Sequence, residues 1–316
     1  MELQTFTQAV VTRPGTLAGA KLVCRLISVW LVLLAFSIAI VAQTAIPKYE
    51  VYAVQYAVLP HFPVSALVAG ADRERRLDIA MMFWVLKGGG HTVLFDSGWY
   101  RGRLLQQWKP QQFIKPSEAV GKLGIKPEEV TDIIVSHTHW DHAGGVDLFP
   151  KAQVWIQKDE YQYYTGESWQ PDAGTDVSTP EGRRAGNAKH GGIDPDDVIA
   201  FVKTNLDGRL NFVNGDDQQV LPGIRCYTGG KHTFQSQFCS VNTRSGTVVL
   251  ASDNMYLYEN LQKHLPIAQT LDANSNLSAQ DRMKQLATKP ELIIPGHDPA
   301  VMTKFPQVTG AVVRID

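Results

Sequence analysis

Three histidines and one aspartate lie within six consecutive residues, directly after a short apolar segment that is typical of a buried strand. The segment is TDIIVS (131–136), and the run HTHWDH follows it without a break. Imidazole nitrogens and carboxylate oxygens are suitable ligands for Zn²⁺ and similar divalent ions. A loop leaving a strand can turn alternate side chains toward one point. We therefore expect His137 and His139 to face one metal ion, and Asp141 and His142 to face a second.

The overall composition is that of a globular protein with ample apolar material for a buried core. Of the 316 residues, 44% are hydrophobic and 19% are charged, which suits one large domain or two of ordinary size. The formal net charge of −1 at pH 7 provides no general electrostatic attraction to nucleic acid. A nucleic-acid partner is therefore not expected.

The N-terminal segment differs from the rest of the chain. Basic residues precede an uncharged apolar run at 26–42, which is slightly long for a signal-peptide core and slightly short for a membrane span. We expect residues 1–42 to be a cleaved export signal, with a retained anchor in the inner membrane as the alternative. Residues 43–316 would then form one domain that is periplasmic or secreted.

Two cysteines, Cys226 and Cys239, flank the segment that contains His232. If the flanks pair as antiparallel strands, the two sulfur atoms would face each other across the ladder. Export permits a disulfide without requiring one, so two buried free thiols are the favoured interpretation.

Apolar runs and turn residues along the chain predict an alternation of strands and helices. Strands are expected at 48–59, 79–87, 91–98, 131–136, 153–157, 210–214, 223–228, 237–243, 247–252 and 291–298. Helices or helical turns are expected at 116–123, 127–129, after Gly145, and at 196–205 and 278–288. Residues 158–210 are polar, aromatic and typical of loops, and are expected to form an insertion that covers the site. This order predicts an α+β protein with two sheets packed face to face and helices outside.

The run HTHWDH resembles the HxHxDH motif of the metallo-β-lactamase superfamily, and further landmarks of that family follow in order. LFDSG (94–98) resembles its early strand ending in an aspartate, and KHT (231–233) resembles the segment with a third histidine. LASDNMY (250–256) resembles the strand with a bridging aspartate, and PGHD (295–298) resembles the segment with the last histidine. The resemblance covers nearly all of residues 49–300. It implies an αββα sandwich of two mixed sheets, with the metal site at one sheet edge.

The resemblance also implies two divalent metal ions per chain. Zinc is the expected ion, and Mn²⁺, Fe²⁺ and Co²⁺ are alternatives because ligand type alone does not decide between them. The implied ligands are His137, His139 and His232 for one ion, Asp141, His142 and His297 for the other, and Asp253 as the bridge.

Four further positions bear on the implied site. Asp96 is expected to hydrogen-bond a metal ligand rather than to bind metal itself, and Asp298 is either a similar support or a plain turn residue. Lys231 and Phe234 stand where the family often has a small residue and a proline. This departure is expected to alter the pocket wall near the third histidine.

Tyr256 stands three residues after Asp253. This spacing resembles the N-acyl homoserine lactonase branch, where a tyrosine at that position helps to hold the lactone carbonyl. The implied reaction is opening of a lactone ring by a metal-bridging hydroxide, with Tyr256 polarising the carbonyl and Asp141 delivering the proton. Core packing is the alternative for Tyr256. An acyl channel is then expected to be lined by Tyr161, Tyr163, Tyr164 and Trp169.

Two other functions remain as alternatives. The first is a hydrolase of the same fold that acts on another ester, a phosphotriester or a β-lactam, and the second is a binding protein without catalysis. The expected partner is a small-molecule lactone or ester, with membrane contact only through an N-terminal anchor. The resemblance also allows a homodimer.

Overall fold

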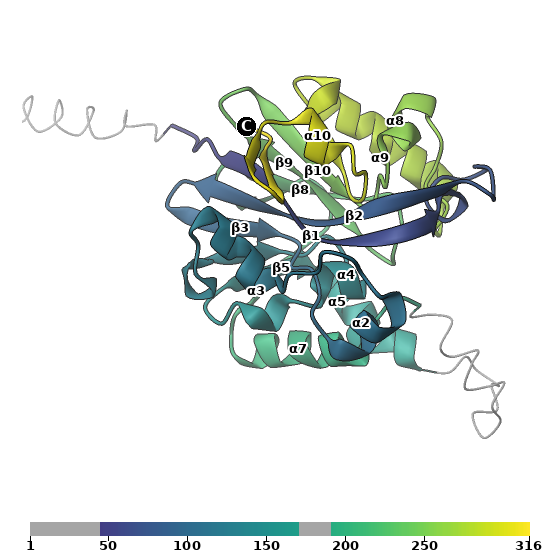
Figure 1. Cartoon of the computed structure of the whole chain (residues 1–316). Coiled ribbons are helices and arrows are strands. Elements are labelled where there is room, and N and C mark those ends of the chain that lie inside the picture. Colours follow the sequence, from purple (N-terminus) through teal and green to yellow (C-terminus); the bar gives the residue numbers. More distant parts are fainter. Residues whose placement is uncertain (1–44, 171–190) are drawn as a thin grey trace, which may run out of the picture. The chain divides into compact units, whose positions relative to one another are not determined.

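Two sheets form the centre of the computed structural model, which describes residues 45–170 and 191–316 (Figure 1). The strands of the larger sheet are β1 (Glu50–Pro63), β2 (Arg76–Gly88), β3 (His91–Phe95), β4 (Asp132–Ile134), β5 (Gln153–Gln157), β6 (Leu210–Val213), β12 (Gln307–Thr309) and β13 (Val312–Arg314). Those of the smaller sheet are β7 (Gln218–Leu221), β8 (Ile224–Thr228), β9 (Gln237–Asn242), β10 (Thr247–Ser252) and β11 (Ile293–Pro295). Their spatial orders are β12-β13-β1-β2-β3-β4-β5-β6 and β11-β10-β9-β8-β7.

Both sheets contain parallel and antiparallel strand pairs. Strand β2 is almost continuously apolar because both of its faces are buried. Its residues Met82 and Trp84 pack between the sheets with Cys226 and Leu250, whereas Met81 and the alternate residues pack on the other face, toward the helices. Because successive side chains in a strand point to opposite faces, a strand buried on both sides needs apolar residues throughout.

Helices cover the outer face of each sheet (Figure 1). Those next to the larger sheet are α2 (Gly102–Trp108), α3 (Pro116–Ala119), α4 (Trp140–Ala143), α5 (Lys158–Thr165) and α7 (Pro195–Leu206). Those next to the smaller sheet are α8 (Tyr258–Lys263) and α9 (Ala273–Leu286), whereas α10 (Val301–Lys304) contacts β1 and β13 of the larger sheet. Single 3-10 turns lie at Val64–Ala66, Val120–Leu123, Pro127–Glu129, Val146–Leu148, Glu167–Trp169 and Pro290–Leu292. The predicted αββα sandwich is confirmed.

Some element predictions were wrong. The segment after residue 157 was expected to be loop, but it begins with helix α5, which buries Glu160 and Tyr164 one helical turn apart. Helix α9 begins five residues before the expected position, because the Asp272 carboxylate accepts hydrogen bonds from two backbone N–H groups of its first turn. The helix expected after Gly145 is a single 3-10 turn. Helices α2, α4, α8 and α10 and strands β7, β12 and β13 were not predicted.

Cys226 and Cys239 form a disulfide, so the favoured interpretation of two free thiols was wrong. The register of the β8–β9 pair places the two residues directly opposite each other, with Cα atoms 4.2 Å apart. A cysteine pair at such facing positions is close enough to bond without backbone movement.

The expected export segment at 1–42 lies outside the described residues, as do residues 171–190 of the expected insertion. Within the part of the chain that the structure describes, no helix combines the length and the apolar character needed to cross a membrane.

Candidate metal centre

The carboxyl ends of four strands bring the candidate residues together at one edge of the sandwich. In the larger sheet, β3 and β4 run parallel, and Asp96 and the 136–142 loop follow directly after them. In the smaller sheet, β10 and β11 run parallel and lead into Asp253 and His297. Ligand sites in α/β sheets commonly form at the carboxyl ends of parallel strands, where loop side chains converge.

The seven predicted ligands form two groups that share Asp253. Within each group, one potential ligand atom per residue lies within 4.8 Å of all the others. The groups are His137, His139, His232 and Asp253, and Asp141, His142, Asp253 and His297.

The carboxylate of Asp253 lies between the two groups and offers one oxygen to each. Its Oδ2 is 3.3 Å from Nε2 of His232 and 3.7 Å from Nε2 of His137. Its Oδ1 is 3.2 Å from Nε2 of His142 and 3.0 Å from Nε2 of His297. This arrangement suits a carboxylate that bridges two ions.

Hydrogen bonds on the outer side of three imidazoles fix their orientation. Nδ1 of His142 lies 2.8 Å from the Asp96 carboxylate, and Nδ1 of His232 lies 2.8 Å from the carbonyl oxygen of Gln269. Nδ1 of His297 lies 3.0 Å from the carbonyl oxygen of Ala80. When Nδ1 donates its proton outward in this way, Nε2 is left as the free ligand atom facing the centre.

Unpartnered polar atoms at the centre test whether the residues fit a metal. His137 Nε2, His142 Nε2 and Asp253 Oδ1 are buried and have no hydrogen-bond partner among the described residues. Buried polar atoms are rarely left unpaired, because their desolvation is not then compensated. Two divalent ions would supply the missing partners, so the His/Asp clusters are suitable for a dinuclear site.

The electrostatics of the metal-free centre differ between its histidines. Asp253 and Asp141 raise the pKa of His142 and of His297 in spite of burial, so metal binding would displace a proton from these two rings. Burial and the neighbouring His232 lower the pKa of His139 to about 3, and burial with His142 lowers the pKa of His137, so both rings are neutral. Burial alone would raise the pKa of Asp253, but His142 and His297 more than offset it and hold this carboxyl ionised. Neutral imidazole and ionised carboxylate are the forms that bind metal.

Asp96 joins the two sheets beneath the centre, as predicted for a residue that supports a ligand. Besides His142, its carboxylate accepts hydrogen bonds from the Ser136 backbone N–H at 2.8 Å, from the Ser136 hydroxyl at 3.0 Å and from the Ser252 hydroxyl at 2.8 Å. Asp298 instead accepts from the backbone N–H groups of Tyr258 and Ala300, so it is a turn residue.

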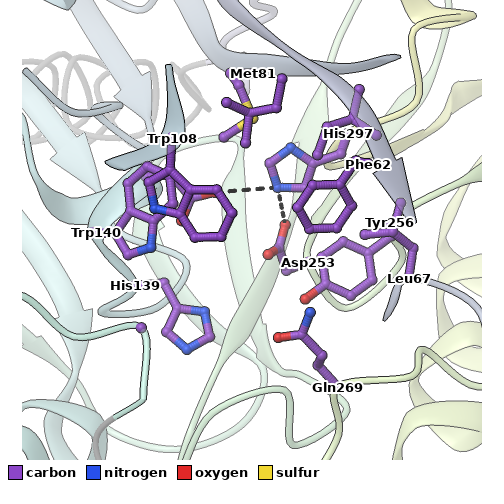
Figure 2. A pocket seen from close by; sticks show the side chains of 14 residues that line it. Phe62, Leu67, Met81, Trp108, His139, Trp140, Asp253, Tyr256, Gln269 and His297 are labelled. Carbon is purple, nitrogen blue, oxygen red and sulfur yellow. Dashed lines mark ion pairs between the residues drawn. The ribbon is translucent and has the colours of Figure 1, made fainter. Parts of the chain in front are cut away.

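A cavity of about 210 Å³ opens beside the centre (Figure 2). Its polar side holds Asp141, Asp253, His139 and His297, with Tyr256 nearby. Figure 2 shows Trp108 and Trp140 on the side opposite Tyr256 and Gln269. The apolar part of the wall comes from Leu59, Phe62, Leu67, Ile79, Met81, Trp108 and Trp140.

The predicted aromatic channel was wrong, because none of its four residues lines this cavity. Tyr161 contacts Phe212, and the Tyr163 ring stacks on Phe234 at 4.1 Å between centroids. Tyr164 is buried, and its carbonyl oxygen accepts the indole N–H of Trp169. Since the segment begins as helix α5, its aromatic residues pack away from the cavity.

Three residues of the site were not predicted from the sequence. Trp140 lies inside the histidine motif, and its ring stacks on Trp108 at 5.4 Å. Gln269 holds His232 through its carbonyl oxygen. Gly192 lines the cavity, and its carbonyl oxygen accepts the Trp140 backbone N–H at 2.9 Å. The tryptophan in the motif was the one visible signal.

Lys231 and Phe234, which differ from the residues common in the family, make contacts within and beside the His232 loop. Lys231 has a φ of 55° and donates through Nζ to the Phe234 carbonyl oxygen at 2.7 Å and to Gln235 Oε1 at 2.8 Å. Phe234 turns toward α5, where it stacks on Tyr163. The altered residues therefore shape the outer side of this loop rather than the cavity.

Several known proteins are similar to this chain in sequence or in fold. An N-acyl homoserine lactonase from Bacillus cereus is 26% identical over 210 residues, which span 65% of this chain and 70% of the relative. A solved N-acyl homoserine lactone hydrolase with N-hexanoyl-L-homoserine at its catalytic metal centre is similar in fold, with a TM-score of 0.64, 18% identity and coverage of 82% and 97%. AidC, a dizinc quorum-quenching lactonase, is also similar, with a TM-score of 0.60, 14% identity and coverage of 85% and 94%.

The sequence profile of the metallo-beta-lactamase superfamily matches residues 82–297, which include all seven candidate ligands. The chain therefore belongs to the metallo-beta-lactamase superfamily.

Proposed function

We propose that this protein is a dinuclear metal-dependent hydrolase that opens the ring of N-acyl homoserine lactones or related lactones. The observation that carries the proposal is the place of Tyr256, whose ring lies beside one histidine of each group. Its centroid is 5.4 Å from that of His232 and 5.8 Å from that of His297. The curated relatives named above support an enzyme of the lactonase or esterase type.

The Tyr256 hydroxyl is suited to donate a hydrogen bond to a substrate carbonyl. Burial, and then the negative charges of Asp253 and Asp141, raise its pKa well above the usual value near 10. Both effects favour the protonated phenol, which is the form that can donate. A fixed donor aimed at the place where negative charge develops is worth most in a site shielded from water.

Lactone hydrolysis adds the oxygen of water to the carbonyl carbon, breaks the ring C–O bond and returns a proton to the departing oxygen. Two divalent ions, held by the seven ligands, would supply the activated water and polarise the carbonyl. Asp141 lines the cavity, with Oδ2 3.4 Å from Nε2 of His142. Burial opposes its ionised form, but His142 and His297 hold its pKa below the usual value, so it is free to accept a proton and pass it on.

The cavity wall fits an acyl lactone in one further respect. The apolar side chains of strands β1 and β2 face the candidate metal centre across the cavity, together with Trp108 and Trp140. A mostly apolar pocket with a few convergent polar groups is the usual form of a small-molecule site. A bound acyl lactone would place its ring against the polar side of the cavity and its acyl chain against the apolar side.

The proposal is tested by incubating the purified protein with a short-chain and a long-chain N-acyl homoserine lactone, with metal content measured on the same sample. We expect ring opening, about two metal ions per chain, and loss of activity in His139→Ala. Two bound ions without turnover of either lactone would contradict the lactonase assignment while keeping the hydrolase.

An aryl ester is the second candidate substrate class. The indole ring of Trp108 stacks on Trp140 with an interplanar angle of 18° and also contacts Phe62, which gives an aromatic ring a surface to stack on. Comparing aryl esters, phosphotriesters and β-lactams with the lactones, by kcat/KM, decides between these classes.

We also propose that the protein acts outside the cytoplasm. The basic and then apolar composition of residues 1–42 supports export. The Cys226–Cys239 disulfide also supports export, because disulfides form and persist mainly in oxidising compartments. The mass of the protein recovered from each cell fraction distinguishes a cleaved signal, a retained anchor and a cytoplasmic protein.

A further inference from the structure

A completely buried carboxylate lies close to the loops that carry His137, His139 and His232, the three histidines of the first group of candidate ligands. Glu160 belongs to the first turn of helix α5, and none of its surface is exposed. It is not one of the seven candidate ligands. A buried carboxylate without a compensating set of partners would be strongly destabilising, so its contacts need an explanation.

Glu160 accepts hydrogen bonds from both loops that carry the first group of histidines. Its Oε1 accepts from the backbone N–H of Thr138 at 3.0 Å, from the hydroxyl of the same residue at 3.0 Å, and from the hydroxyl of Thr233 at 2.7 Å. Its Oε2 accepts from the backbone N–H of Gln235 at 2.6 Å. Thr138 stands between His137 and His139 in the sequence, and Thr233 follows His232.

The two loops come from different sheets. The first loop follows β4 of the larger sheet, and the second connects β8 and β9 of the smaller sheet. Gln237 joins them through two hydrogen bonds: its backbone N–H donates to the Ser136 carbonyl oxygen at 2.8 Å, and its side-chain Nε2 donates to the Val135 carbonyl oxygen at 2.7 Å. The His139 and His232 rings also meet, with Nδ1 of the first 2.9 Å from Nε2 of the second. Glu160 adds a connection through the residues next to these histidines.

We propose that Glu160 is a positioning residue that sets the spacing between the His137–His139 pair and His232, and so the affinity of the ion that these three would hold. The inference rests on the proposed metal centre and not on the identity of the substrate. Groups that hydrogen-bond metal ligands typically contribute 10–100-fold in metal affinity. Glu160 bonds the residues next to the ligands, so it acts by holding both ligand loops in place before the metal arrives.

Glu160→Gln tests this contribution with almost no change in volume. Each carboxylate oxygen faces a backbone N–H, which can only donate. A glutamine has one amide oxygen and one NH₂ group, so in either orientation its NH₂ meets a backbone N–H. One of the two loops therefore loses its acceptor, whichever way the amide turns.

Asp132→Asn is the matched control. Asp132 is also a buried carboxylate, and it accepts from His91 Nδ1 at 2.8 Å, from Trp155 Nε1 at 3.0 Å and from the Thr131 hydroxyl at 2.7 Å. It begins strand β4, whereas the histidine loop follows the end of that strand. This substitution disturbs a comparable hydrogen-bond set at the opposite end of the strand.

The measurement is stepwise removal of Zn²⁺ or Co²⁺ from the full-length protein by a competing chelator, together with thermal unfolding of the metal-free protein. The wild type is expected to release two ions in separate steps, and His139→Ala identifies the step of the first group. In Glu160→Gln we expect that step alone to move to 10–100-fold weaker binding. In Asp132→Asn we expect both steps to stay in place.

The outcomes separate this inference from the proposed function. If wild type and Glu160→Gln release both ions identically, or if Asp132→Asn moves the same step, Glu160 has no specific positioning role. If the wild type holds fewer than two ions, the metal centre itself is wrong, and the inference falls with it. If Glu160→Gln does not fold, Thr233→Val removes one of the four hydrogen bonds, and it must move the same step by a smaller amount.

Discussion

Gly192 lies against the imidazole of His139 so closely that no larger residue fits there. A Cβ atom at Gly192 would be 2.7 Å from Cδ2 and 2.9 Å from Nε2 of His139. Gly192 also has a φ of +81°, a left-handed conformation that other residues adopt at a cost of about 1–2 kcal/mol. A glycine from the expected insertion therefore packs directly on a candidate metal ligand.

We expect Gly192→Ala to displace the His139 ring, to weaken binding of one metal ion and to lower hydrolytic turnover more than tenfold. The physical reason is the contact below 3 Å, which neither the ring nor the left-handed backbone can relieve without a shift. Metal release and kcat are the measurements. Gly191→Ala is the control, because a Cβ atom there has open space around it. Equal behaviour of the two variants would show that the contact has no functional effect.

Asp96→Asn is expected to weaken the binding of the other metal ion, the one that His142 would hold. Asp96 has a φ of 65°, which asparagine tolerates well, so the backbone stays unchanged. The amide NH₂ of an asparagine would face either the Ser136 N–H or the His142 Nδ1 proton, and one acceptor is lost. We expect a 10–100-fold loss of metal affinity in one step of a chelator titration. Ser252→Ala, which removes one donor to the same carboxylate, should have a smaller effect on that step.

The ligand set could be predicted from the sequence because its information is local. Six of the seven candidate ligands follow closely after a recognisable apolar strand, and metals prefer few side-chain types, so His137 to His142, Asp253 and His297 stand out. His232 lies in the longer loop between β8 and β9. The structure brings these residues together in two groups that share Asp253. The strand pattern likewise predicted most of both sheets, because buried strands require continuous or alternating apolar residues.

The surroundings of the site could not be predicted in the same way. Trp108 meets Trp140 only because helix α2 packs beside the histidine loop, a contact between segments more than 30 residues apart. Helix α5 has a polar and aromatic sequence that looks like loop, and it is helical because tertiary contacts bury Glu160 and Tyr164. The Cys226–Cys239 disulfide depended on a strand register that spacing alone left open.

Tyr256→Phe separates a catalytic role of this residue from a packing role. The ring is retained, so the contacts with His232 and His297 persist, and only the hydroxyl is lost. We expect lactone kcat to fall about 100-fold, as for loss of one fixed oxyanion donor, with metal content unchanged. Tyr258→Phe is the control, since its buried hydroxyl has no hydrogen-bond partner among the described residues. If Tyr256→Phe retains wild-type kcat, the residue serves packing alone.

Asp197 makes the stability of the protein depend on pH away from the metal centre. It is 1% exposed in helix α7, its Oδ1 accepts from Arg101 Nε at 2.8 Å, and its Oδ2 has no partner among the described residues. Burial raises its pKa to about 7 in spite of Arg101, with the nearby Asp194 and Asp147 adding to the rise. The folded state therefore holds a proton that the unfolded chain, with a carboxyl pKa near 4, has released.

Between about pH 4 and pH 7 the folded state binds more protons at Asp197 than the unfolded state, so this group's contribution to stability falls as the pH rises. The slope is at most about 1.4 kcal/mol per pH unit. Asp197→Asn removes the titration, and its amide oxygen can still accept from Arg101. We expect the difference in free energy of unfolding between the variant and the wild type to grow in the variant's favour from pH 5 to pH 7 and then to level off. Denaturant unfolding at several pH values measures this difference, and a difference independent of pH would mean that Asp197 is already ionised throughout.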